Sequence, residues 1–517
     1  MVPFASRTAV RGAFWLVVAA FSLSGCGAGA APAAGSTGTP PATSPPASSA
    51  AGASAAAGAS QAASASAGSS SAAPSLAAQS SPAAATAGAS SSSTSVASQA
   101  SAGADWPTYH RDNARAGVGP DQPPLASPKQ AWSAKVDGAV YGEPLIVGNR
   151  VYVVTENDSA YALDANTGTV VWQKHVGEAV PRSALPCGNI DPSGFTATPV
   201  IDVARKELYA VGRFQPAHHE LWVFDLDSGA EKYHRTVDPQ GTDPRYLQDR
   251  SAVTLAGGKV FVSFGGNFGD CGPYKGWVVS APEGDSSGAL TTFAVPTQRE
   301  GAIWAPPGPA VDSNGDLLVA TGNAESAGDF DYANAVIRLG PDLKMKDYWA
   351  PSDWKALSAS DTDIGSVSPS LLQANQTFQI GKAGVGYLLK TDNLGKIGGE
   401  IYQQKICNGA FGGNAYQPPM LYVPCTNALL ALRVQAGKFD VAWQATAGRL
   451  NSPIVAYGSV WTVDTNDAVL YQLNPADGSV RNKLQLPGPT VAHFLTPSAA
   501  GGKVFVSSGA NVLAFGA

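Results

Sequence analysis

The chain has 517 residues, of which 44% are hydrophobic and only 14% charged, so it is long enough for one large domain or several small ones. Its formal net charge of -6 leaves no basic surface for a phosphate backbone, so nucleic acid is not expected as a partner. No charged residue occurs between Gly27 and Ala104, so the part of the chain that can fold is expected to begin near residue 105.

The first 26 residues have the pattern of a bacterial export signal. Arg7 and Arg11 give a positive start, the apolar stretch from Ala13 to Leu23 follows, and Leu23-Ser24-Gly25-Cys26 comes directly after it. That last run is similar to a lipobox, which implies cleavage before Cys26 and acylation of its thiol. The alternative is an ordinary secretory signal with a chance cysteine. We expect residues 1–25 to be removed and Cys26 to hold the protein at the extracytoplasmic face of the cell membrane.

Residues 26–104 are predicted to be a lipidated cysteine followed by a tether. The stretch consists almost wholly of Ala, Ser, Gly, Thr and Pro and contains no aromatic residue. Such a segment buries too little apolar surface to offset the entropy of ordering it. A flexible chain of this length has a root-mean-square span of about 50 Å. The folded domain, residues 105–517, is expected to be a monomer tethered to the membrane.

Beyond the tether, a hairpin unit repeats along the chain. The clearest copy is Val151–Val154, a turn, and then the run from Ser159 to Trp172. Short alternating or apolar runs on both sides of each turn are typical of β-hairpins. Weaker copies end at Gly229 and Gly478, each with Asp or Asn opening the turn and Gly in the positive-φ position. The repeats predict turns that join the last two strands of a propeller blade.

The first copy carries a family resemblance. Ala162-x-Asp164-x-x-Thr167-Gly168-x-x-x-Trp172 resembles the tryptophan-docking motif of pyrroloquinoline-quinone (PQQ)-like propellers. The resemblance implies that the tryptophan packs against the neighbouring blade, which makes Asp164, Gly168 and Trp172 structural. Asp105 to Gly117 also resembles the entry-strand region of this family, so the likeness covers residues 105–517. It implies an all-β propeller with an architecture similar to that of BamB-type lipoproteins.

The blade count follows from the starts of the first strands, and the ends of the chain indicate how the ring closes. Trp132–Val136 copies a fourth strand, whereas the chain stops on a third strand near Phe515, so the first segment completes the last blade. We expect eight four-stranded antiparallel blades, with seven as the alternative. The expected starts are Glu143-Pro144, Thr198-Pro199, Ser251-Ala252, Pro309-Ala310, Ser368-Pro369, Asn414-Ala415, Ser452-Pro453 and Thr496-Pro497.

Residues just before the first strands should line one mouth of the central channel. If they form a ligand site, it is a polar one of mixed charge. The alternative is a solvated funnel whose polar side chains only satisfy loop backbone. The candidates are Arg250, Arg299, Glu300, Asp363, Asn414, Asn451 and His493.

The four cysteines of the folded region are expected to form disulfides. Their even number suits an oxidising compartment and allows three pairings. We favour Cys407 with Cys425 and Cys187 with Cys271, because all four fall in loops at the same channel mouth. Their expected role is to staple long loops, and a catalytic thiol is not expected.

Other chemistry-bearing patterns have simpler explanations. Asp312–Asp316 and the GxSxG match at Gly284–Gly288 are expected to be hairpin turns. His218 and His219 point to opposite sides of a strand, so no metal site is expected there. Gly381–Gly386 lacks the helix that a phosphate-binding loop needs.

Three functions remain. The leading expectation is a non-catalytic, membrane-tethered scaffold without a cofactor, which binds an envelope protein or a small ligand. The alternative is a quinoprotein dehydrogenase that uses PQQ and calcium to oxidise alcohols or sugars. Against it, the chain has no vicinal cysteine pair and no haem motif, and only Glu300, Asn323 and Asp363 offer a calcium ligand set. The third is a carbohydrate- or peptide-binding propeller, which would expose the aromatic residues Trp304, Tyr274 and Trp354 on one rim.

Overall fold

The computed structural model describes residues 105–325, 328–446, 448–488 and 493–517. This part of the chain is almost entirely β-structure, with one short helix, α1 (Trp354–Ala359), and two 3-10 turns, η1 (Arg182–Ala184) and η2 (Pro244–Tyr246). None of its helices is long and apolar enough to cross a membrane. The export signal, Cys26 and the tether lie outside the described residues.

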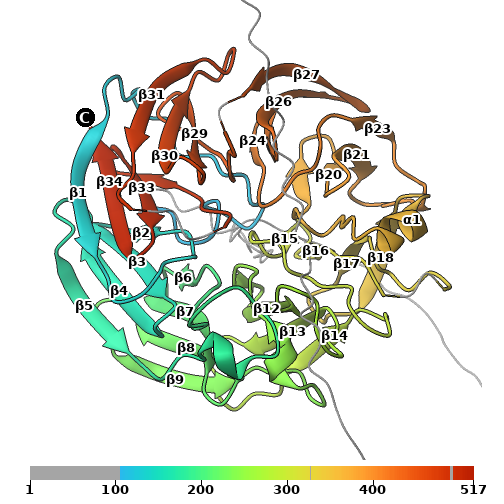
Figure 1. The fold of residues 1–517 in the computed structure, drawn as a ribbon, viewed down its shortest axis with the longest axis horizontal. Coiled ribbons are helices and arrows are strands. Elements are labelled where there is room, and N and C mark those ends of the chain that lie inside the picture. The colour runs from blue at the N-terminus through green and yellow to red at the C-terminus, as the bar shows by residue number, and fades with distance from the viewer. Residues whose placement is uncertain (1–104, 326–327, 447, 489–492) are drawn as a thin grey trace, which may run out of the picture. The chain divides into compact units, whose positions relative to one another are not determined.

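Eight β-sheets surround a central axis (Figure 1), which confirms the prediction of eight blades and excludes seven. Within each blade, successive strands pair antiparallel from the channel outward. The first four blades consist of β2 (Leu145–Val147), β3 (Arg150–Thr155), β4 (Ser159–Asp164) and β5 (Val170–His175); β6 (Val200–Asp202), β7 (Glu207–Phe214), β8 (His218–Asp225) and β9 (Glu231–Thr236); β11 (Thr254–Ala256), β12 (Lys259–Gly266), β13 (Trp277–Pro282) and β14 (Thr291–Ala294), with β10 (Leu247–Gln248) added; and β15 (Ala310–Val311), β16 (Leu317–Ala320), β17 (Val336–Leu339) and β18 (Met345–Ala350), with the parallel β22 (Lys396–Ile397) added.

The second half of the ring repeats the plan. Its blades consist of β19 (Ser370–Leu372), β20 (Gln376–Gln379), β21 (Val385–Lys390) and β23 (Tyr402–Lys405); β24 (Ala415–Gln417), β25 (Met420–Cys425), β26 (Ala428–Gln435) and β27 (Lys438–Ala445); β28 (Ile454–Ala456), β29 (Ser459–Asp464), β30 (Val469–Leu473) and β31 (Val480–Gln485); and β32 (Ser498–Ala500), β33 (Lys503–Ser508), β34 (Asn511–Gly516) and β1 (Lys129–Lys135).

The ring closes through the first strand, as the sequence predicts. β1 pairs antiparallel with β34, from Lys129 opposite Gly516 to Lys135 opposite Asn511. The N-terminal strand therefore supplies the outer strand of the last blade and covers an edge that would otherwise be open.

Tryptophans on outer strands join neighbouring blades. The indole N–H of Trp172 donates to the carbonyl of Leu226 at 3.2 Å, and its ring covers Gly229 in the turn of the next blade. Gly229 has φ +67, and a Cβ there would lie 2.6 Å from the Trp172 ring. Trp132 covers Gly168 in the same way. Each of these turns therefore needs glycine for two reasons: the backbone is left-handed there, and the tryptophan ring lies too close for a side chain.

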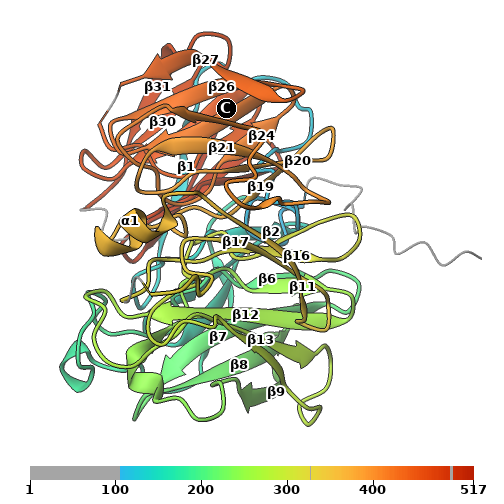
Figure 2. The ribbon, with the colours of Figure 1, turned by 90° about the vertical axis from the view of Figure 1, so that its right-hand side faces the viewer.

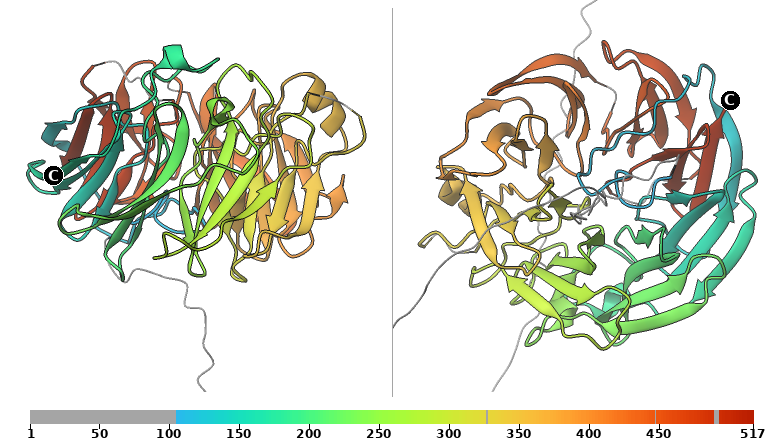
Figure 3. Two further views of the ribbon diagram at one scale, coloured as in Figure 1. Left: turned by 90° about the horizontal axis from the view of Figure 1, so that it is seen from below. Right: turned by 180° about the vertical axis from the view of Figure 1, so that it is seen from behind.

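The segment from Asp105 to Gly119, which resembles an entry strand, adds no strand to a blade. It crosses the centre of the ring, where Figure 3 (right) shows it in blue, and makes single backbone contacts with inner strands. The amides of Ile201, Val311 and Val455 donate to its carbonyls at 2.8 Å. The segment also reaches the start of β32, where the Tyr109 hydroxyl lies 3.0 Å from Thr496 Oγ1. We call residues 105–119 the plug, because they cross the central channel.

Candidate functional site

The loops that carry the candidate residues emerge at one mouth of the channel, and α1 lies on the same face in the edge-on view of Figure 2. The structure gathers these residues into two neighbouring groups rather than one continuous ring. The first, the polar cluster, consists of Arg299, Glu300, Asn323, Asp363 and Lys382. The second, the aromatic cluster, consists of Trp304, Phe411 and Phe494 together with Arg250.

Four loops of two adjacent blades build the polar cluster. Glu300 lies between β14 and β15, Asn323 follows β16, Asp363 follows α1, and Lys382 follows β20. Glu300 has φ 69, a region that costs a side-chain-bearing residue roughly 1 kcal/mol or more, so its placement is imposed by the surrounding structure.

Hydrogen bonds connect the cluster in one chain. Glu300 pairs with Arg299 at 2.9 Å, and its other oxygen accepts from the Asn323 amide nitrogen Nδ2 at 3.2 Å. The backbone N–H of Asn323 donates to Asp363 Oδ1 at 2.8 Å, and Asp363 Oδ2 pairs with Lys382 Nζ at 2.9 Å. Two carboxylates therefore sit in fixed orientations, each with its own cation.

The two carboxylates of the cluster are balanced by its two cations, but burial disfavours the ionised form of both acids. Burial raises the pKa of Asp363, and the Lys382 ammonium acts against this effect. Burial raises the pKa of Glu300 to about 7, and Asp270, Glu325 and Asp363 add to this effect while Arg299 opposes it. Carboxylates outside the cluster therefore surround a site whose own charges balance.

The donor chemistry of the cluster fits a calcium or lanthanide ion. Such ions take oxygen ligands, and Glu300, Asn323 and Asp363 supply two carboxylates and one amide. Among the described residues no three His, Cys, Asp or Glu side chains converge as a complete metal site. The protein would thus provide only part of the coordination shell, and water or a bound cofactor would provide the remainder.

The aromatic cluster adjoins the polar one. The rings of Trp304, Phe411 and Phe494 lie with their centroids 5.9 to 6.4 Å apart. The Gly412 amide beside Phe411 donates to the Ser366 carbonyl at 2.9 Å, which joins this wall to the loop of Asp363. Phe411 and Phe494 also line a small recess of about 10 Å³, which has room for roughly one water molecule.

Arg250 gives the aromatic cluster a positive charge. Its guanidinium lies 5.7 Å from the Phe494 ring and 5.8 Å from that of Tyr141 and donates to the His493 carbonyl at 2.8 Å. It is buried, and the carboxylates of Glu156 and Asp249 act on it electrostatically. PQQ is a flat aromatic tricarboxylate, so a stacking surface beside a buried cation suits it.

The other predicted mouth residues are mainly structural. Asn414 is buried deeper and donates to Ser370 Oγ at 2.9 Å. Asn451 donates to the Val463 carbonyl and accepts from the Phe494 amide, so it holds the loop that carries Phe494. Burial lowers the pKa of His493, with Arg449 and Arg250 adding to the effect, which favours a neutral imidazole.

The two disulfides pair as the sequence analysis expected. Cys187 is bonded to Cys271 and Cys407 to Cys425, all on the face of the candidate site. Asp312–Asp316 joins β15 to β16 and Gly284–Gly288 joins β13 to β14, as expected for hairpin turns. Buried His219 hydrogen-bonds to Asp238 at 2.7 Å.

The expected signs of a carbohydrate- or peptide-binding rim are missing. Tyr274 is 3% exposed and Trp354 is 8% exposed, so both pack inside the blades. Trp304, which is half-buried, belongs to the aromatic cluster at the channel.

Sequence reasoning missed three residues of the site. Lys382 was visible only inside a glycine-rich run that has no phosphate-loop context, and its role depends on the loop that brings it to Asp363. Phe411 and Phe494 stand in loops without a motif and resemble ordinary core residues. The one sequence signal for this part of the site was that aromatic and basic residues occur together just before the first strands of several blades.

Comparison with known proteins agrees with this picture. The model of the outer membrane protein assembly factor BamB family matches residues 125–271. A polyvinylalcohol dehydrogenase of a Pseudomonas species is 25% identical over 228 residues, 41% of this chain and 34% of that protein, and the enzyme of that name from Sphingopyxis is 23% identical over 46% of this chain and 37% of its own length. The chain thus spans about a third of the length of these relatives. The solved quinohemoprotein alcohol dehydrogenase of Pseudomonas putida HK5 superposes with a TM-score of 0.66 at 14% identity, over 80% of each chain.

The two polyvinylalcohol dehydrogenases and the superposed structure overturn the leading expectation of a non-catalytic scaffold, because all three are named as dehydrogenases. A vicinal cysteine pair and a haem motif are not part of the polar cluster, so their absence from the sequence does not bear on it. The chain is a PQQ-like β-propeller.

Proposed function

We propose that this propeller is a quinone-dependent dehydrogenase that oxidises an alcohol at the mouth of its channel. The observation that carries the proposal is the polar cluster, in which Asp363 is buried, oriented by the Asn323 amide and paired with Lys382, directly beside the aromatic cluster. A carboxylate held in this way suits proton transfer from a hydroxyl group.

The reaction would convert a secondary alcohol to a ketone, or a primary alcohol to an aldehyde. When bound, PQQ would supply the two-electron acceptor for the C–H hydride, and a calcium or lanthanide ion would supply a Lewis acid. Asp363 would take the proton of the substrate hydroxyl. The names of the two relatives suggest a polymeric alcohol as the substrate.

Each residue of the site would have a distinct task. Asp363 Oδ2 would take the hydroxyl proton, and Lys382 would keep this carboxylate ionised until then. Trp304, Phe411 and Phe494 would exclude water from one side of the cofactor, and Arg250 would bind one of its carboxylates. Glu300 and Asn323 would hold the cation.

The test is dye-linked oxidation of ethanol, a sugar and polyvinyl alcohol by the full chain, loaded with PQQ and calcium or a lanthanide. We expect turnover by the wild-type protein and at least a 100-fold loss in Asp363→Asn, since a general base contributes about 10²–10⁴-fold. Asp361→Asn is the matched control, because this exposed carboxylate pairs with the same Lys382. No turnover of any alcohol by the loaded protein would refute the proposal.

We also propose that Cys26 anchors the enzyme to the membrane. Support comes from the Leu23-Ser24-Gly25-Cys26 run and the uncharged stretch behind it. Metabolic labelling with a radioactive fatty acid should mark the wild-type protein and not Cys26→Ser. Equal labelling of both would contradict the anchor.

A further inference from the structure

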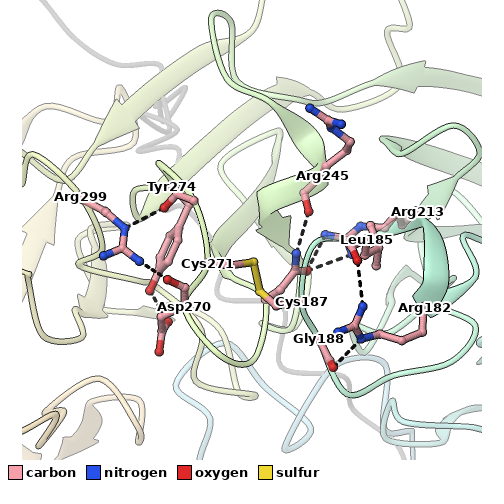
Figure 4. Close-up of a disulfide and its surroundings, with 12 residues drawn as sticks. Arg182, Leu185, Cys187, Gly188, Arg213, Arg245, Asp270, Cys271, Tyr274 and Arg299 are labelled. Carbon is pink, nitrogen blue, oxygen red and sulfur yellow. Dashed lines mark hydrogen bonds between the residues drawn. A yellow bond between two sulfur atoms is a disulfide. The ribbon is translucent and has the colours of Figure 1, made fainter. Parts of the chain in front are cut away.

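The loop between β12 and β13 is exposed at its tip, and one covalent bond joins it to a distant part of the chain. Phe268 at its tip is 71% exposed, and the neighbouring Gly269 and Asp270 are exposed as well. The Cys187–Cys271 disulfide ties this loop to the segment after β5, 84 residues earlier in the chain. Figure 4 shows the bond between the two loops.

This loop binds Arg299 through its backbone. Arg299 Nε donates to the Gly272 carbonyl at 2.7 Å, and its Nη2 donates to the Asp270 carbonyl, as Figure 4 shows. Asp270 is itself fixed by the Tyr274 hydroxyl, which donates to Oδ1 at 2.5 Å. The guanidinium therefore has two acceptors on the stapled loop.

The remaining nitrogen of Arg299 serves the polar cluster. Nη1 lies 2.9 Å from Glu300 Oε1 and 3.1 Å from Glu325 Oε1. From Glu300 the hydrogen-bond chain continues through Asn323 to Asp363. An unbroken series of contacts thus leads from the disulfide to the carboxylate that we propose as the base.

We propose that the Cys187–Cys271 disulfide is a redox-dependent positioning device for the site, and that it acts by fixing Arg299 against Glu300. With the bond formed, the Asp270 and Gly272 carbonyls hold the guanidinium in place. With the bond broken, the loop loses its covalent anchor and Arg299 loses its orientation. Arg299 is a positioning residue in this scheme, because it touches Glu300 and no reacting atom.

Reduction is a balanced exchange. A small dithiol breaks the S–S bond, leaves two thiols on the protein and becomes a cyclic disulfide itself. The structural part of the proposal is independent of the reaction, whereas its consequence for the cation rests on the proposed function. Two readouts keep these parts separate.

The first readout is hydrogen–deuterium exchange of the full chain. The Glu300 amide donates to the Tyr274 carbonyl and the Asn323 amide to Asp363, so both amides report on the cluster. In the Cys187→Ser/Cys271→Ser variant we expect both to exchange about 10-fold faster or more, while amides of the β29–β30 hairpin keep the wild-type rate. Unchanged exchange at Glu300 and Asn323 would overturn the proposal.

The second readout is terbium luminescence, which reports cation affinity without any turnover. Loss of a residue that orients a metal ligand typically weakens binding about 10–100-fold. We expect that loss in the double serine variant and in Arg299→Gln, and a smaller one in Arg299→Lys, which keeps the charge. Arg245→Gln, on the same face but paired with Asp243, should bind as the wild type does.

Combining the changes tests whether they act through one path. If the disulfide works through Arg299, the triple variant binds terbium no more weakly than Arg299→Gln alone. If the loss of terbium affinity in the triple variant equals the product of the two separate losses, the disulfide acts elsewhere and the proposal is overturned. Absence of terbium binding to the wild-type protein would count against the proposed cation site, and the exchange result would then decide this inference by itself.

Discussion

Glu156, in the turn between β3 and β4, should make the propeller less stable as the pH rises. It is 2% exposed, and one carboxylate oxygen accepts from the Gly194 amide at 2.8 Å and from the Thr196 hydroxyl at 3.0 Å. The other oxygen, Oε1, is buried without a hydrogen-bond partner. Burial raises the pKa of Glu156 from 4.5 to about 7, although these two donors and the nearby Arg250 and Arg213 act in the opposite direction.

The sign follows from which state binds the proton more tightly. Between pH 4.5 and 7 the folded protein holds the proton while the unfolded chain releases it, so the free energy of unfolding falls as the pH rises. Below pH 4.5 both states are protonated and the group has no effect. Above pH 7 both are ionised and the full cost applies, which at 1.36 kcal/mol per pKa unit is about 3 kcal/mol.

The experiment compares Glu156→Gln with the wild type by urea unfolding at pH 5 and pH 8. Between pH 5 and pH 8 the free energy of unfolding of the variant should rise by about 3 kcal/mol relative to that of the wild type, since glutamine cannot ionise. Glu178→Gln, an exposed change of the same charge on the same face, should show no such gain. An equal stability difference between Glu156→Gln and wild type at both pH values would refute the reasoning.

Three further outcomes are expected. Asp363→Asn should lose turnover about 10²–10⁴-fold while it still binds PQQ in a calorimetric titration, and loss of PQQ binding instead would assign Asp363 to the cofactor. Gly229→Val should cost about 2 kcal/mol or more in urea unfolding, because its Cβ meets the Trp172 ring at 2.6 Å, whereas Gly437→Val, with open space around a φ of +80, should lose only the backbone part. Arg115→Met should cost about 3 kcal/mol in the same assay, since its guanidinium holds the plug through the Pro309 carbonyl and the Thr254 hydroxyl. Equal costs for the two glycine changes, or a neutral Arg115→Met, would contradict these contacts.

The propeller was predictable because its signals are local. Each blade repeats a hairpin whose Asp and Gly stand at fixed offsets, as at Asp164 and Gly168, and the orphan strand at Trp132 marks how the ring closes. The sequence of the plug has no periodicity, because its backbone makes single hydrogen bonds with several different blades and pairs along none of them. Nothing in residues 105–119 could therefore distinguish a plug from an entry strand.

The site was predictable only in part. Glu300 and Asp363 could be named because they precede first strands, and every such loop opens at the same mouth. Their assembly with Lys382 depends on the conformation of loops in two blades, which no spacing in the sequence encodes. Function was harder still, because a buried cation such as Arg250 indicates a ligand only when its position over the Phe494 ring is visible in three dimensions.

Calorimetric titration of the full chain with PQQ, in the presence and absence of calcium, tests the central claim most directly. We predict binding at micromolar concentration or tighter that strengthens with calcium, and at least a 10-fold loss in Arg250→Met, because a charge-assisted pair contributes about 1.5–3 kcal/mol. No binding with or without calcium, or equal binding by the wild type and Arg250→Met, would contradict the assignment of this channel mouth as a quinone site.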